Sequence, residues 1–172
     1  DDSWILQTVQ HPSDASHRAP FNHVGYGASM RILFVDDEPQ HVDVVQRTVS
    51  EALDAEVVVV ASVEEAVQAL HSAQFDLVVT DIFIPLGPHP RDAMGPRSRK
   101  YADTVQHLGG LVLLDELDRV VPPPTVLAHT ACTDVALLEI LGGCVHGRVP
   151  KPAPVDVLLK AVIEALDLPV PQ

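Results

Sequence analysis

The stretch Met30–Pro39, MRILFVDDEP, decides the fold predicted for this chain. Its uncharged apolar run ILFV leads without a spacer into Asp36, Asp37 and Glu38. Such a run is typical of a buried parallel strand, and ligands of open α/β sheets bind at the carboxyl ends of the strands. Adjacent carboxylates there repel each other unless a cation neutralises them, and hard oxygen ligands suit Mg²⁺. The stretch therefore predicts either a magnesium site or a solvated acidic turn.

Length and composition limit the classes of protein to consider. The chain has 172 residues, is 47% hydrophobic and carries a net charge of -13. This length predicts one domain with an appendage, and the negative charge argues against direct nucleic-acid binding. No apolar run approaches the roughly 20 residues of a membrane span, and the first residues lack the features of a secretory signal. Because Cys132 and Cys144 are too few for a disulfide framework, we expect a reduced, cytoplasmic protein, with both thiols buried as small hydrophobes.

Apolar strands alternate with helical patterns through most of the chain. The expected strands are 32–35, 56–61, 75–80, 125–130 and 144–149, and the expected helices begin near residues 39, 62, 110, 135 and 154. Val44, Val121 and Val157 are expected among the apolar positions that face the core. This alternation predicts an α/β fold, a doubly wound five-stranded parallel sheet flanked by five helices.

Two segments depart from this rhythm. Residues 1–29 are predicted to form an N-terminal extension or leader that is mostly loop. His11, His17 and His23 recur in it every six residues, a spacing that fits a zinc-binding site poorly. Residues 86–108 form a long insertion within the domain, 30–168, and 169–172 form a tail. The insertion carries Arg91, Arg97, Arg99 and Lys100. This basic cluster is either a solvated face or a docking site for an acidic surface, including another copy of the chain.

Chemically active residues follow four of the five predicted strands. They are Asp36 and Asp37 after the first, Asp81 after the third, Thr130 at the end of the fourth and Lys151 after the fifth. In a doubly wound sheet these ends meet at one crevice. The carboxylates are suited to hold Mg²⁺, and one of them to attack a phosphoryl group, whose oxygens the lysine and the threonine would contact.

Four motifs in this order resemble the receiver domain of two-component response regulators, which has a flavodoxin-like fold. They are VDDEP at 35–39, TDIFIP at 80–85, HTA at 129–131 and KP at 151–152. The resemblance implies that Asp81 is the phosphoacceptor. It implies that Mg²⁺ binds Asp37 and Asp81, with Asp36 and the Phe83 backbone carbonyl as further ligands.

The resemblance also implies roles for the later motifs. Thr130 would be the switch hydroxyl, and Lys151 would contact a phosphoryl oxygen from a turn in which Lys151–Pro152 is cis. A histidine kinase or phosphotransfer protein would phosphorylate the protein in a phosphorelay. The chain would not be an enzyme beyond its own phosphorylation and dephosphorylation. Phosphorylation would switch protein contacts, with a homodimer through the last helices as one outcome.

Three positions depart from the family pattern. The loop after Asp81 is much longer, and Arg148 occupies the place of the aromatic switch residue. These departures favour an alternative, a phosphorylation-independent interaction module gated by the loop. Phe83 stands where a phosphatase-like hydrolase would need a second acid, which argues against that activity. His129 is expected to be a hydrogen-bonded core or edge residue.

Overall fold

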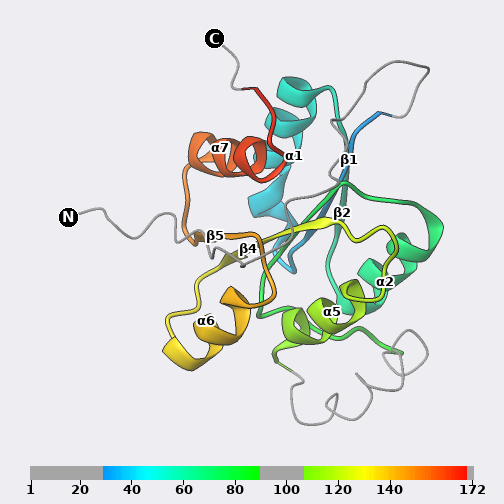
Figure 1. Cartoon of the computed structure of the whole chain (residues 1–172), viewed down its shortest axis with the longest axis vertical. Coiled ribbons are helices and arrows are strands. Elements are labelled where there is room, and N and C mark those ends of the chain that lie inside the picture. The colour runs from blue at the N-terminus through cyan, green and yellow to red at the C-terminus, as the bar shows by residue number, and fades with distance from the viewer. Residues whose placement is uncertain (1–28, 90–106, 170–172) are drawn as a thin grey trace, which may run out of the picture.

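The computed structural model describes residues 29–89 and 107–169 (Figure 1). The expected N-terminal extension with its three histidines lies almost wholly outside the described residues. So do the basic cluster of the insertion and the last three residues of the tail.

The sheet has five parallel strands in the order β2-β1-β3-β4-β5. Their bounds are β1 Arg31–Val35, β2 Glu56–Val60, β3 Leu77–Thr80, β4 Thr125–Thr130 and β5 Gly147–Pro150. The predicted doubly wound parallel sheet is confirmed. β5 begins three residues later than expected, because the Cys144 and Val145 N–H groups donate to the Leu141 carbonyl in the turn that precedes it.

Helices cover both faces of the sheet. Their bounds are α1 Pro39–Leu53, α2 Val63–Ser72, α5 Gly109–Leu117, α6 Val135–Gly142 and α7 Val155–Ala165. In Figure 1, α1 and α7 lie on one side of the sheet, and α2, α5 and α6 lie on the other. All five predicted helices are therefore present among the described residues.

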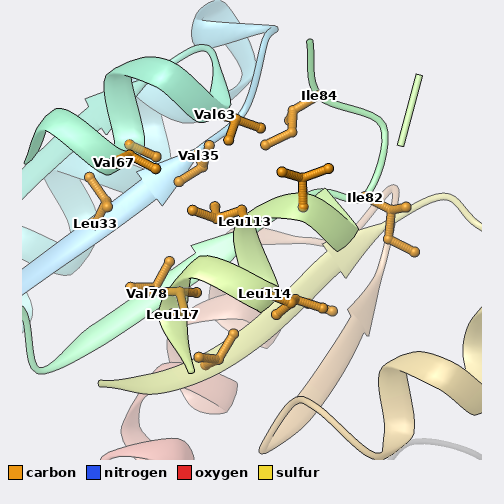
Figure 2. Packing of buried hydrophobic residues seen from close by; sticks show 14 of the residues in the cluster. Leu33, Val35, Val63, Val67, Val78, Ile82, Ile84, Leu113, Leu114 and Leu117 are labelled. Atoms are coloured by element: carbon orange, nitrogen blue, oxygen red, sulfur yellow. The ribbon is translucent and has the colours of Figure 1, made fainter. Parts of the chain in front are cut away.

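The apolar run of β1 is buried on both faces, as a central parallel strand requires. Leu33 and Val35 pack with the side chains of α2 and α5, while Ile32 and Phe34 pack with α1 and α7. Figure 2 shows the first cluster, with Leu113 of α5 among the strand residues. Each such side chain contributes roughly 1.5–3 kcal/mol by leaving water. The two clusters hold β1 rigidly, and thus its acidic carboxyl end.

Some residues expected in the core are exposed. Val44 and Val157 lie on the outer sides of α1 and α7, and Cys144 is exposed whereas Cys132 is buried. Val121 is also exposed, because α5 ends at Leu117 and the chain has already left the helix. Apolar periodicity alone overstated the width of the buried helix faces.

The segment after β3 is fixed by the first turns of two helices. Pro85 and Leu86 carbonyls accept hydrogen bonds from the N–H groups of Val63 and Glu64 in α2. Ile82 and Ile84 carbonyls accept from Gly110 and Gly109 at the start of α5, at 3.0 and 3.1 Å. A Cβ on Gly110 would clash with the Asp81 carbonyl oxygen, so this contact requires glycine. The described ends of the insertion are thereby tied to the backbone that follows Asp81.

Candidate functional site

Four of the predicted site residues meet at one edge of the sheet. Asp36 follows β1, Asp81 follows β3, Thr130 ends β4 and Lys151 follows β5. Because β1, β3, β4 and β5 are neighbours and parallel, their carboxyl ends lie side by side. Asp36, Asp81 and Thr130 are only 5%, 7% and 1% exposed. The sheet therefore brings two buried carboxylates, a buried hydroxyl and an ammonium group together.

The Lys151 ammonium bridges the two buried carboxylates. Its Nζ donates to Asp36 Oδ2 at 2.6 Å and to Asp81 Oδ2 at 2.8 Å. These residues are 115 and 70 positions apart in the chain, and the Lys151–Pro152 peptide is cis, as the resemblance implied. One cation thus offsets two buried anions, which leaves the three groups with a net charge of about -1.

Backbone amides orient the remaining oxygen atoms. Asp36 Oδ1 accepts from the Glu38 N–H at 3.0 Å, and Asp81 Oδ1 accepts from the Phe83 N–H at 3.2 Å. Thr130 Oγ1 accepts from the Cys132 N–H at 3.3 Å. Each of the three side chains is therefore held by the loop that follows its own strand.

The contacts shift the acid–base equilibria of the site. Burial raises the pKa of Asp81, but the Lys151 ammonium, the Thr130 hydroxyl and the Phe83 N–H lower it more, so it lies below its usual value. Burial lowers the pKa of Lys151, but its two carboxylate partners raise it above its usual value. At neutral pH Asp81 is therefore an ionised carboxylate and Lys151 an ammonium.

The chemistry of these donors fits Mg²⁺. Within residues 29–89 and 107–169, no three or more His, Cys, Asp or Glu side chains form a group that could hold a metal ion. Mg²⁺ needs no such group, because one or two carboxylates commonly hold it while water and phosphate oxygens complete its octahedron. Asp37 follows Asp36 directly and is exposed, whereas Asp81 is buried. Bound Mg²⁺ would share the buried carboxylates with Lys151.

Two further residues were singled out in the sequence, and one ion pair was missed by it. Phe83 is 41% exposed, and its backbone N–H donates to Asp81 Oδ1. Arg148 is exposed on β5 and lines a pocket together with Thr130 and Lys151. The ion pair between Lys151 and Asp36 was not foreseen, because no local sequence signal links positions so far apart.

His129 differs from its prediction. It is half-buried in β4 beside Val149. Within residues 29–89 and 107–169 its buried Nε2 has no hydrogen-bond partner, so the expected hydrogen bond is not found at this atom. Burial and the Lys151 charge lower the pKa of His129, while Asp36 and Asp81 partly oppose them. His129 is therefore a neutral imidazole behind the site.

Comparisons with known proteins agree with this architecture. No protein-family model matches the chain, and no curated protein matches it. The signal receiver domain of an HD domain-containing protein from Pseudomonas fluorescens matches with a TM-score of 0.63 at 22% identity, over 85% of this chain and 93% of that one. A CheY-like response regulator receiver domain protein from Methanospirillum hungatei matches with a TM-score of 0.62 at 21% identity, over 81% and 95%.

A third solved structure leads to the same fold. The signal receiver domain of a putative Luxo repressor protein from Vibrio parahaemolyticus matches with a TM-score of 0.61 at 18% identity, over 81% of this chain and 92% of that one. The chain therefore has the fold of response regulator receiver domains, as its motifs predict. Among the described residues, no helix is long and apolar enough to cross a membrane.

Proposed function

Because the chain has the receiver-domain fold, we propose that it is a phosphoprotein switch in a two-component phosphorelay. In this proposal, Asp81 accepts a phosphoryl group from a histidine kinase or phosphotransfer protein in the cytoplasm. One observation carries the proposal: the Lys151 ammonium lies 2.8 Å from a buried, ionised Asp81 carboxylate at the carboxyl end of β3. If Asp81 only capped a helix, it would need no such cation beside it.

The transfer uses groups that the structure places together. An Asp81 carboxylate oxygen attacks phosphorus, and the bond between phosphorus and the donor's imidazole nitrogen breaks, with its electron pair remaining on that nitrogen. The product is an acyl phosphate on Asp81. Lys151 offsets the charge on the phosphoryl oxygens, and Thr130 donates a hydrogen bond to one of them. Later attack of water on phosphorus releases inorganic phosphate and restores the carboxylate.

Mg²⁺ is the cofactor that this reaction implies. The carboxylates of Asp36, Asp37 and Asp81 and the Phe83 backbone carbonyl would hold it. When bound, Mg²⁺ supplies positive charge that neutralises the phosphoryl oxygens. Phosphorylation would change the carboxyl ends of β4 and β5, and with them the contacts made by α6 and α7, including a homodimer. No enzymatic activity on other substrates is proposed.

One observation favours the alternative, a phosphorylation-independent interaction module. Lys151 already occupies both buried carboxylates, so the site is stabilised without a ligand. In that case the acidic site is a structural network, and the insertion after β3 carries the interaction. The two functions differ in whether Asp81 reacts.

Intact-mass analysis distinguishes them. The full chain is incubated with acetyl phosphate, with Mg²⁺ or with a chelator, as wild type and as Asp81→Asn. The matched control is Asp118→Asn, which changes an exposed aspartate after α5. We expect one Mg²⁺-dependent phosphoryl adduct in the wild type and the control and none in Asp81→Asn. A folded wild type that takes no adduct contradicts the phosphorelay proposal and supports the interaction module.

A further inference from the structure

An open pocket of about 250 Å³ lies beside Thr130 and is not used by the reaction described above. The start of α6, the loop before it and the end of β5 line this pocket. Of the described residues that line it, Arg148 and Lys151 are charged and none is acidic. The pocket is therefore a cationic space directly next to the proposed phosphorylation site.

The register of β4 and β5 places Arg148 where it can enter this space. Arg148 pairs with Ala128 and Pro150 pairs with Thr130, so Arg148 lies on the same face of the sheet as Thr130. The step between alternate residues of a strand is about 7 Å, which a long arginine side chain spans. Ala128, the neighbour of Arg148 on β4, has no side chain beyond Cβ to block the path.

Electrostatic attraction would draw the Arg148 side chain toward a phosphoryl group on Asp81. Arg148 is exposed, and in the described part of the chain its guanidinium has no hydrogen-bond or ion-pair partner. Phosphorylation replaces the single charge of the Asp81 carboxylate with about -1.5 to -2 on the phosphoryl group, at a site where Lys151 also pairs with Asp36. A cationic side chain besides Lys151 and any bound Mg²⁺ is therefore needed more after phosphorylation than before it. Guanidinium is suited to this role, because its planar fork binds phosphoryl oxygens in pairs.

We infer that Arg148 is a second cationic ligand of the phosphoryl group on Asp81 and that its side chain fills the pocket when that group is present. This inference rests on the proposed function. In the unphosphorylated protein, Arg148 presents a positive charge on the surface of β5. In the phosphorylated protein, that charge is withdrawn beside Thr130, and the exposed acids Asp134 and Glu139 of the α6 region dominate the surface. In this switch, a charged Arg148 side chain would move where an aromatic side chain occupies the same position in the receiver family.

The test uses the full chain with Mg²⁺ and beryllofluoride, a phosphoryl analogue that binds without hydrolysis. Nuclear magnetic resonance follows the Nε–H signal of the Arg148 side chain, which is assigned because it disappears in Arg148→Gln. Titration followed by the same method gives the affinity for beryllofluoride. We expect this signal to shift and to be protected from exchange on binding. We expect about tenfold weaker affinity in Arg148→Gln and a smaller loss in Arg148→Lys, since ammonium keeps the charge but not the fork.

Arg47→Gln is the matched control, because it removes the same charge from an exposed position of α1. Its affinity should equal that of the wild type. If Arg148→Gln binds as tightly as the wild type and the Arg148 signal does not move, the inference is wrong while the proposed function stands. If the folded wild type neither binds beryllofluoride nor takes a phosphoryl adduct, both are wrong.

Discussion

Replacing Lys151 with methionine tests how the acidic site is held together. The change keeps the length and packing of the side chain but removes the charge that two buried carboxylates share. The ammonium lies 2.6 Å from Asp36 and 2.8 Å from Asp81, and the lysine side chain is only 16% exposed. At an effective dielectric constant of about 20, each pair attracts with about 6 kcal/mol. The cost of burying the ammonium offsets much of this, so the expected loss is about 3–5 kcal/mol at pH 7.

The pH dependence of Lys151→Met should reverse that of the wild type. In the wild type the folded pKa of Asp81 is lowered, so its contribution to stability is present above the unfolded pKa and is lost as the pH falls through the folded pKa. In the variant, burial and the charge of the neighbouring Asp36 carboxylate raise the pKa of Asp81. A raised carboxyl pKa favours folding at low pH, so the variant should lose less stability at pH 5 than at pH 7.

Urea unfolding followed by circular dichroism at pH 5 and pH 7 measures both effects. Lys160→Met is the control, because Lys160 is 72% exposed and 3.7 Å from Glu164, a pair worth under about 1 kcal/mol. Adding Asp36→Asn to Lys151→Met should restore part of the stability at pH 7. A Lys151→Met variant within about 1 kcal/mol of the wild type at pH 7 would refute the argument that this cation holds the site.

Three further changes test single features by the same assay. His129→Leu removes an imidazole whose buried Nε2 has no hydrogen-bond partner among the described residues, so it should stabilise the protein by about 1 kcal/mol. The gain should grow as the pH falls below about 6.5, because the lowered pKa of His129 in the folded protein favours unfolding there. A destabilised variant would contradict this. Gly110→Ala should lower the free energy of unfolding by at least about 2 kcal/mol, because the added methyl group meets the Asp81 carbonyl. Gly142→Ala, with open space around it, should be neutral or stabilising. Equal effects would show that the start of α5 can shift. Ser62→Ala should cost about 1 kcal/mol by loss of the α2 cap, and no loss would mean that the cap is dispensable.

Local patterns in the sequence were sufficient to predict the elements of this fold. The β1 run reads as a buried strand because a central parallel strand is apolar on both faces. The helix expected to begin near residue 62 is α2, where Ser62 Oγ accepts from the Glu65 N–H and Glu65 Oε2 accepts from the Ala61 N–H. Asp134 likewise caps α6. Caps and apolar runs are decided by neighbouring residues, so they are visible without the fold.

The side of a helix that faces the core was less predictable. Val44 and Val157 continue apolar patterns but are exposed, because burial depends on how far each helix lies from the sheet and from its neighbours. Val121 was also expected in the core, but α5 ends at Leu117, four residues before it.

The sequence by itself determined which residues stand at the strand ends, because strand and helix patterns place Asp36, Asp81, Thr130 and Lys151 at the same point of successive units. The tertiary structure alone decided how they pair. Strand order and register decide that Lys151 bridges both buried carboxylates and that Arg148 borders a pocket beside Thr130. They also decide that His129 Nε2 finds no hydrogen-bond partner among the described residues. These relations join residues far apart in the chain, and only the packing of the sheet brings them within the few ångströms at which charges and hydrogen bonds act.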